Sequence, residues 1–347
     1  MATSDINTNP EHIEVEQIIL GFGANWNHAN FGIDYSEKMW EDPVSRINTQ
    51  TETERLLHKR FGDIGIGNPS PKPKPGINSY SDRFLSVLFG CRPVYQVNQP
   101  ICVLPLEGDY DLLEKFDIPE LKNSAIIEKA FTEADILTKE FGFCSAQIGR
   151  SSPLNVAFST FGELFLAALA EEPALAQHVL QVVIDTYIKL YYELQNKIEP
   201  DVYPSDRFDF GYGNCQAIMI SPEMYREVIL PVDLEFRKRI DTFDLHHCGV
   251  FDKYALMYKE LKPDKIDVGA NSDYEYMREI FPDTPASLII EPVDIEGKSR
   301  EDIDRLVSKM IKNAAPYSLI PYIWTADFSL NMTDENIRDL STAHLRI

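Results

Sequence analysis

The chain has 347 residues, of which 44% are hydrophobic and 25% are charged, a composition typical of a globular protein with a large core. Its formal net charge of −22 argues against nucleic acid or an anionic membrane as a partner, because phosphate groups are bound by clustered Lys and Arg. No apolar run approaches the roughly 18 residues of a membrane span. The N-terminus also lacks the features of a signal peptide, so we expect a cytoplasmic protein.

The first predicted elements alternate between strand and helix. Residues 1–14 are polar and are expected to form a loose arm. A strand is predicted over Val15–Gly21, and Tyr35–Arg60 has the spacing of apolar residues that is typical of a helix. The short apolar run Phe61–Gly67 is interpreted as a second strand.

A proline-rich segment, residues 69–76, then interrupts the pattern and can form neither a helix nor a central strand. We interpret residues 69–139 as an insertion that packs on the main domain and has its own small helices over 82–89, 109–116 and 123–139. A strand over Phe143–Ile148 follows, and then a long helical block over Pro153–Ile198 that breaks near Glu172-Pro173, since proline is favoured at the first position of a helix.

Strands and helices alternate through the rest of the chain. Strands are predicted over 208–212, 241–247, 264–268, 287–290 and 317–324, and helices over 221–240, 251–261, 273–281, 299–314 and 333–343. About eight strands in total, most of them followed by a helix, favour an α/β fold of the (β/α)8 TIM-barrel type over a doubly wound sheet. The expected organisation is one barrel domain with N-terminal helical additions and the insertion after the second strand. No G-x-G-x-x-G or P-loop motif follows any strand, which argues against a nucleotide site.

A candidate metal site lies in Asp241–Gly249, which is interpreted as a buried strand running into a turn. Because side chains alternate along a strand, His246 and Cys248 should point the same way and His247 the opposite way. An imidazole nitrogen and a thiolate together form half of a site for a soft metal, for which zinc is the commonest candidate. A lone His-x-Cys is also compatible with an inert buried cysteine. The five cysteines are scattered without a C-x-x-C motif and are expected to be reduced.

The ends of the predicted strands supply further candidates, since barrel enzymes act where the strand-to-helix loops converge. The remaining metal ligands are expected to come from Glu291, Asp327 or another carboxylate at the mouth of the barrel. Glu291 and Asp327 are also candidate catalytic groups, together with Asn214. The simpler interpretations are a helix cap for Glu291 and a loop turn for Asp327. The candidate substrate-binding residues are Trp26, Asn27, His28, Arg150, Tyr212 and Trp324. The aromatic residues could equally be core, and Arg150 could pair with a neighbouring carboxylate.

Several motifs together resemble the uroporphyrinogen decarboxylase superfamily, and the resemblance covers residues from about 35 to 343. They are Tyr35-Ser-Glu, Asp42-Pro-Val-Ser-Arg, Phe61-Gly-Asp, Gly162-Glu-Leu, Glu172-Pro173, Ile220-Ser-Pro-Glu through Pro231, His246-His-Cys-Gly249, Glu291-Pro-Val-Asp and Thr333-Asp-Glu-Asn336. The superfamily has a (β/α)8 barrel, so the resemblance implies the fold that the strand count also favours.

Two branches of that superfamily compete. The decarboxylases use an arginine-containing N-terminal segment and a catalytic Asp on a polycarboxylated substrate, whereas Gly21–Asn27 contains no arginine. The other branch comprises corrinoid-dependent methyltransferases, in which His-x-Cys and a later Cys bind zinc at the mouth of the barrel. His246 and Cys248 match the first two of these ligands. Thr325-Ala326-Asp327 stands where the family has the later cysteine.

This departure suggests an oxygen ligand in place of a thiolate, which would make zinc a harder Lewis acid, better suited to an ether oxygen. The resemblance then implies an O-demethylase that moves a methyl group from a methoxylated, aromatic substrate to the Co(I) of cobalamin carried by a separate corrinoid protein. The alternative is transfer from a methylated corrinoid to a thiol such as coenzyme M. A decarboxylase-like or non-catalytic barrel is the second alternative, and a homodimer is left open.

Overall fold

The structure is a computed structural model, and it describes residues 18–146, 148–149, 151–199, 208–314 and 323–347. The expected arm over residues 1–14 and the candidate Arg150 lie outside the described residues. By its internal contacts the chain divides into two compact units, residues 22–246 and residues 1–21 together with 247–347. The division falls within one strand, between His246 and His247.

A mostly parallel sheet with helices around it confirms the expected α/β class. Its strands are β1 (Ile18–Gly21), β4 (Phe210–Gly213), β5 (Phe243–His247), β6 (Lys265–Val268), β7 (Ala286–Ile290) and β8 (Ile323–Asp327). They follow the order β1-β8-β7-β6-β5-β4, and the pairs whose register is described are parallel. Among the described residues the sheet has six strands rather than eight, so closure into a full barrel stays a prediction.

The strand predicted over Phe61–Gly67 is wrong. This segment ends helix α3 (Pro43–Phe61) and continues as the short 3-10 helix η1 (Gly62–Ile64). Gly65 and Gly67 have φ values of +80° and +73°, in the left-handed region that favours glycine. A Cβ atom on Gly67 would lie 2.2 Å from the backbone nitrogen of His58, so the chain turns back closely against α3.

The strand predicted over Phe143–Ile148 is reduced, among the described residues, to one parallel bridge between Ser145 and Gly76. Ser145 donates its N–H to the carbonyl of Pro75 at 3.0 Å and accepts from the N–H of Ile77 at 3.1 Å. The partner of the bridge is therefore the end of the proline-rich segment. Proline cannot donate to a ladder, which is consistent with so short a pairing.

Helices dominate the unit of residues 22–246. They are α1 (Ala24–Phe31), α2 (Glu37–Glu41), α3, η2 (Ser81–Arg83), α4 (Phe84–Leu88), α5 (Tyr110–Glu114), α6 (Ala125–Phe141), α7 (Pro153–Phe161), α8 (Glu163–Glu171) and α9 (Pro173–Ile198). The small helices of the insertion and the break at Pro173 are thus confirmed. The antiparallel hairpin of β2 (Arg92–Val94) and β3 (Cys102–Leu104) was not predicted.

The helix predicted over 221–240 contains an irregular turn. It consists of α10 (Pro222–Met224), a π-helical turn η4 (Tyr225–Ile229) and α11 (Leu230–Arg237). Within it the N–H of Leu230 donates to the carbonyl of Tyr225, five residues back. Pro231 has no N–H to offer to the carbonyl four residues before it, so a regular α-helical ladder cannot run through this point. The π-turn inserts one extra residue there.

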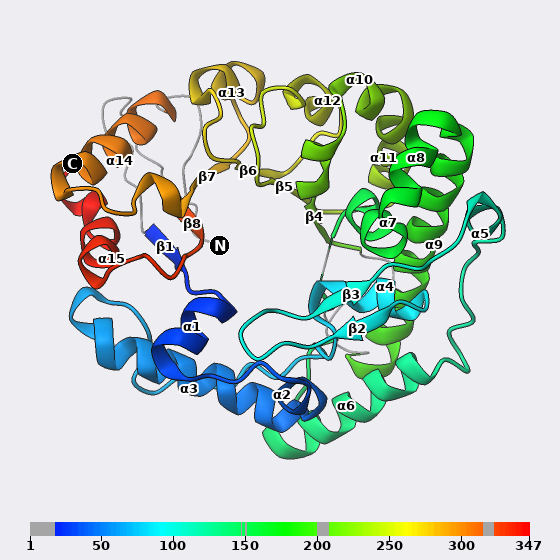
Figure 1. The fold of residues 1–347 in the computed structure, drawn as a ribbon, viewed down its shortest axis with the longest axis horizontal. Helices are drawn as coiled ribbons and strands as arrows, with labels where there is room; N and C mark the ends of the chain where they lie inside the picture. The colour runs from blue at the N-terminus through cyan, green and yellow to red at the C-terminus, as the bar shows by residue number, and fades with distance from the viewer. Residues whose placement is uncertain (1–17, 147, 150, 200–207, 315–322) are drawn as a thin grey trace, which may run out of the picture. The chain divides into compact units, whose positions relative to one another are not determined.

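The helices of the other unit pack on its strands and on one another. They are α12 (Ala255–Glu260), α13 (Tyr274–Ile280), η5 (Pro292–Asp294), α14 (Arg300–Ala314), α15 (Asp334–Ser341) and η6 (Ala343–Leu345). Helix α14 buries Ile303, Val307 and Met310, at the spacing of one helix face, and it contacts α13 and α15 (Figure 1). The Thr333 hydroxyl caps α15 by accepting from the N–H of Asn336 at 3.2 Å.

Within the described residues, no single helix is long and apolar enough to cross a membrane. Helices α7 and α8 together have the length and apolar composition of a membrane span, but they are bent by 117° at their junction.

Candidate metal centre

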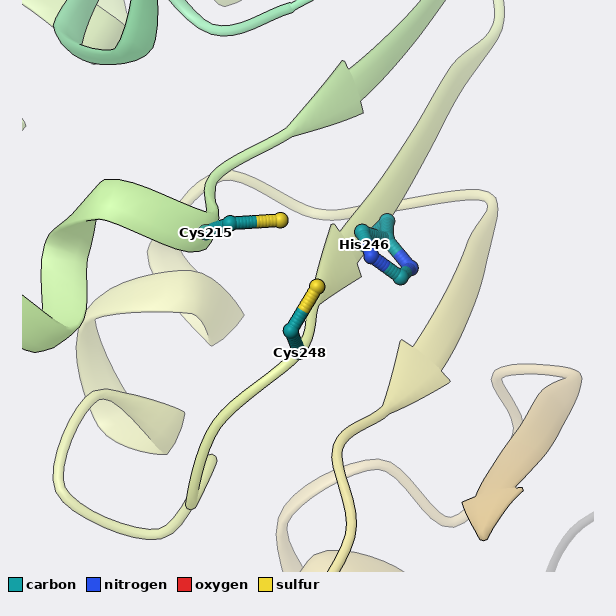
Figure 2. Close-up of side chains that lie close together, drawn as sticks. All are labelled: Cys215, His246 and Cys248. Atoms are coloured by element: carbon teal, nitrogen blue, oxygen red, sulfur yellow. The ribbon is translucent and has the colours of Figure 1, made fainter. Parts of the chain in front are cut away.

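Three side chains near the ends of β4 and β5 form a group that is suited to a metal ion. Figure 2 shows the sulfur atoms of Cys215 and Cys248 and the imidazole of His246 close together. One ligand atom from each residue lies within 4.8 Å of the other two, and all three residues are half-buried. Two sulfur atoms and one nitrogen are the donor set that zinc prefers.

The register of two adjacent parallel strands creates this group. Gly213, the last residue of β4, pairs with His246 on β5. One residue further, the N–H of Asn214 donates to the carbonyl of His246 at 2.8 Å. Cys215 then opens the 3-10 helix η3 (Cys215–Met219), so its side chain leaves the end of β4 beside His246. Cys248 follows directly after His247, the last residue of β5.

His247 points to the opposite face, as the alternation along a strand predicts. Its ring is fully buried, with Nδ1 3.0 Å from the hydroxyl of Tyr258. The rings of Phe251 and Tyr254 lie 5.9 Å and 5.3 Å from it. This histidine therefore anchors β5 in an aromatic cluster while its two neighbours in the sequence face the candidate metal centre.

The turn after Cys248 is held against the end of β6 by a close backbone approach at Gly269. A Cβ atom on Gly269 would lie 2.6 Å from the carbonyl oxygen of Cys248 and 1.9 Å from that of Gly249. Real Cβ atoms do not approach oxygen so closely, so only glycine fits here. The absence of a side chain at Gly269 is thus a condition for the observed position of Cys248.

Cys215 is the member of the group that sequence reasoning did not assign. It follows a predicted strand end, which marked its position, but nothing local distinguishes it from the other cysteines. Its pairing with His246 depends on the register of two strands that are distant in sequence. The proximity of Cys215 to His246 could therefore be predicted only if the register of β4 and β5 were known.

Glu291 and Asp327, the expected oxygen ligands, do not belong to this group in the described residues. Glu291 follows β7, and burial together with the neighbouring Asp294 raises the pKa of its carboxyl group. Asp327 ends β8, and although the residue as a whole is exposed, burial of its carboxyl group raises the pKa. Their roles as ligands or catalytic groups stay predictions.

Asn214, a further catalytic candidate, is completely buried and its side chain is engaged on both sides. Its Oδ1 accepts from the hydroxyl of Ser152 at 2.9 Å, and its Nδ2 donates to the hydroxyl of Tyr225 at 3.3 Å. These bonds place Asn214 in a supporting network directly before Cys215. A direct catalytic role for it stays a prediction.

The aromatic candidates differ in burial. Trp26 is 1% exposed and packs against Phe22, with ring centroids 4.8 Å apart. Tyr212 is also 1% exposed, and its ring lies 5.1 Å from that of Phe243. Both therefore belong to the core. Trp324 on β8 is half-buried and retains accessible surface.

The two polar candidates of α1 make local bonds. Asn27 is buried, and its Nδ2 donates to the carbonyl of Phe22 at 2.7 Å. Its Oδ1 has no hydrogen-bond partner within the described part of the chain. His28 is half-buried, with Nδ1 2.8 Å from the carbonyl of Ile33, so this nitrogen supports the turn after α1.

A separate cavity of about 460 Å³ lies between helices α13 and α14. Its lining combines apolar residues with polar ones, among them Asn271, Asp273, Asp294 and Lys309. None of its lining residues belongs to the Cys215–His246–Cys248 group, so the chemistry of the candidate metal centre gives it no role.

Comparison with known proteins identifies the fold but no family. No protein-family model matches the chain, and no curated protein matches it. A methyltransferase from Methanosarcina mazei has a similar structure, with a TM-score of 0.62 over 96% of this chain and 94% of the other. The two sequences are 14% identical over that match, so the likeness shows the shared α/β fold alone.

The donor set of these three residues is compatible with zinc. Zinc–sulfur bonds of about 2.3 Å and zinc–nitrogen bonds of about 2.0 Å place neighbouring ligands about 3.8 Å or less apart. The ligand atoms lie within 4.8 Å of one another, so binding zinc would require them to approach by at most about 1 Å. With three protein ligands, a bound zinc ion would keep one position for a substrate, as in catalytic rather than structural zinc sites.

Proposed function

We propose that this protein is a zinc-dependent methyltransferase whose metal centre is Cys215, His246 and Cys248, and whose methyl acceptor is a thiol. The single observation that carries the proposal is the second sulfur ligand. The sequence suggested an oxygen ligand beside His246 and Cys248, whereas Cys215 adds a thiolate. Two thiolates neutralise the charge of Zn²⁺ and make the site soft, which favours a sulfur substrate over an ether oxygen.

The fold supports the same class of reaction. The methyltransferase from Methanosarcina mazei has a similar fold over nearly the whole chain. The donor in this proposal is a methylated corrinoid on a separate protein, as the superfamily resemblance implies. The methyl carbon leaves cobalt and bonds to sulfur, the electron pair of the broken bond stays on cobalt as Co(I), and the thiol proton goes to solvent.

The residues of the chain have distinct tasks in this reaction. Cys215, His246 and Cys248 would hold the ion and leave one position open on the side of the substrate. A zinc ion bound there lowers the pKa of a thiol and so supplies the nucleophilic thiolate near neutral pH. His247 and Gly269 keep the ends of β5 and β6 in place, which fixes the direction of the ligands.

Cleavage of a methoxylated substrate is a second candidate, and one observation favours it. Breaking an ether bond needs an acid that protonates the departing oxygen. Burial raises the pKa of Glu291 and of Asp327, so either carboxyl group holds its proton to a higher pH than an exposed carboxyl group does. In this reaction the methyl group would pass from the ether to Co(I) of the corrinoid protein.

Metal analysis tests the metal centre itself. The purified protein should contain about one zinc ion per chain, and Cys215→Ala, His246→Ala and Cys248→Ala should each lose most of it. Cys102→Ala is the matched control, because Cys102 is an exposed cysteine outside the group. Full zinc content in Cys215→Ala would contradict the ligand set proposed here.

A paired assay separates the two reactions. Methylated corrinoid with a thiol, and reduced corrinoid with methoxyarenes, are each incubated with the protein, and the cobalt state is followed by absorbance. We expect demethylation of the corrinoid by the thiol, and its dependence on Cys215. Corrinoid methylation by methoxyarenes without any thiol reaction would support ether cleavage and reject the thiol acceptor.

A further inference from the structure

A buried chain of hydrogen bonds leads from helix α11 to the backbone beside Cys215. The Tyr225 hydroxyl donates to Oδ2 of Asp233 at 2.5 Å. The same hydroxyl accepts from Nδ2 of Asn214 at 3.3 Å. Tyr225 and Asn214 are completely buried and Asp233 is 2% exposed, so water does not compete for these bonds.

The π-turn explains how Tyr225 and Asp233 meet. Residues eight apart on a regular α-helix are rotated by about 80° from each other, because each residue turns the helix by about 100°. The extra residue of η4 makes the separation equivalent to about seven residues, or two turns, and brings both side chains to one face. Pro231 lies within this stretch and has no N–H for a regular α-helical bond, which is consistent with the irregularity. The π-turn thus brings Tyr225 and Asp233 together next to Asn214, the residue before Cys215.

Both neighbours of Cys215 in the sequence are fixed by this network and its extension into α7. Asn214 is held by Tyr225 on one side and by the Ser152 hydroxyl on the other. Gln216 donates its N–H to Oδ1 of Asn155 at 2.9 Å. Cys215 therefore lies between two anchored residues at the start of a short 3-10 helix.

The network also reaches the second metal ligand. Asn214 donates its backbone N–H to the carbonyl of His246, so a shift of Asn214 would move the end of β4 relative to β5. The side chains that hold Asn214 are thus placed to control the distance between Cys215 and His246. They do not touch the ligand atoms themselves in any contact described above.

We propose that Tyr225 and Asp233 are positioning residues that preorganise Cys215 and His246 for metal binding through Asn214. The proposal rests on the metal centre of the proposed function and adds the residues that set its geometry. Outer partners of this kind commonly change metal affinity by about 10- to 100-fold when removed. Here Tyr225 and Asp233 act through the backbone, because they hold Asn214. Asn214 directly precedes Cys215 in the sequence and is hydrogen-bonded to the backbone of His246.

The electrostatics of Asp233 are consistent with a structural rather than a ligating role. Burial raises the pKa of Asp233 to about 7, and the hydroxyls of Tyr212 and Tyr225 oppose this rise. A carboxyl group that accepts a hydrogen bond from Tyr225 does so in either protonation state. The contact therefore persists over the pH range in which zinc is bound by deprotonated cysteines.

The test uses Tyr225→Phe, which removes one hydroxyl and keeps the buried ring. Zinc affinity of the full chain is measured by competition with a chromophoric chelator, and hydrogen exchange is followed for the peptide spanning residues 213–217 without metal. We expect an affinity lower by about 10-fold or more. We also expect loss of amide protection in that peptide of about 10-fold or more, because Asn214 loses a partner.

Two further variants separate positioning from general damage. Asp233→Asn keeps an acceptor for Tyr225 and should retain near-normal affinity, whereas Asp233→Leu should behave like Tyr225→Phe. Tyr274→Phe is the matched control, since it removes a buried hydroxyl from α13, outside the network. In a parallel experiment, Co²⁺ is bound in place of zinc and the absorbance spectrum of each variant is recorded. Displacement of Cys215 should weaken the sulfur-to-metal charge-transfer absorption.

The outcomes distinguish this inference from the proposed function. Wild-type exchange protection and wild-type zinc affinity in Tyr225→Phe would overturn the positioning role. If the unmodified protein bound no zinc but Tyr225→Phe still lost protection over residues 213–217, the proposed metal chemistry would fail and the positioning of Cys215 by Tyr225 would stand.

Discussion

Asp233 is a buried carboxyl group whose ionisation should be visible in the stability of the fold. Burial raises its pKa to about 7, whereas an aspartate in an unfolded chain titrates near pH 3.9, to within about a unit. Between about pH 4 and pH 7 the folded chain holds a proton that the unfolded chain has lost, so this group makes the free energy of unfolding fall as the pH rises.

We therefore expect Asp233→Asn, which has no proton to lose, to lack this part of the decline. Urea unfolding of the wild type and of Asp233→Asn at several pH values between about 4 and 8 measures the difference. The two curves of free energy against pH should converge at low pH and separate toward neutrality. Parallel curves would contradict the raised pKa.

At the residue scale, the sequence predicted the side-chain directions of β5 but not the complete metal group. Alternation along one strand needs only local information, and it placed His246 and Cys248 on one side and His247 on the other. Cys215 reaches the same place through the pairing of Gly213 with His246, which local spacing does not contain. An oxygen ligand was expected because Thr325-Ala326-Asp327 stands where the resembling family has its later cysteine.

At the element scale, Gly269 controls the position of the turn that carries Cys248. A Cβ atom there would overlap the carbonyls of Cys248 and Gly249. Gly269→Ala should therefore push this turn away, destabilise the fold by about 1–3 kcal/mol and weaken zinc binding. Chemical unfolding and chelator competition measure the two effects.

Gly211→Ala is the matched control, because a Cβ atom on this strand glycine of β4 would meet nothing within 4 Å. Its effect on zinc affinity should be small. If Gly269→Ala bound zinc as tightly as Gly211→Ala, the backbone approach would not be a condition for the position of Cys248.

Elements with a long periodic pattern were predicted well, and short glycine-rich runs were not. Helices α9 and α14 have continuous apolar faces, and their positions agree with prediction. Phe61–Gly67 alternates apolar residues with glycine, which imitates a strand. Its glycines instead adopt left-handed conformations that turn the chain against α3. The π-turn was not predicted, because the spacing of apolar residues does not show how a helix adjusts to the missing N–H of Pro231.

At the scale of the whole molecule, strand–helix alternation was sufficient to predict the α/β class, since it requires parallel strands with helical connections. It was not sufficient to count the strands of the sheet. Two of the eight expected strands lie outside the sheet, or are reduced to the single bridge at Ser145, among the described residues. Strand length depends on pairing, which the pattern of one segment does not determine.

The net charge of −22 has a consequence for stability as a whole. Like charges on a compact chain repel one another, and salt screens them with a Debye length that falls from about 30 Å at 0.01 M to about 10 Å at 0.1 M. We expect the free energy of unfolding at pH 7 to rise over this range of sodium chloride, measured by urea titration.

The same series near pH 5, where more carboxylates are protonated, serves as the control for this effect. The dependence on salt should be weaker there, because the net charge is smaller. An equal rise at both pH values would point to excluded-salt effects rather than to relief of repulsion.

The placement of the proposed metal ligands near the ends of two neighbouring strands has a consequence beyond catalysis. An ion held by Cys215 and Cys248 would tie together the two ends of the segment between them, so part of its binding free energy would become folding free energy. The population of folded chains then grows with the free zinc concentration relative to its dissociation constant. Zinc starvation would deplete the intact protein itself, and a chelator would act on it as a denaturant.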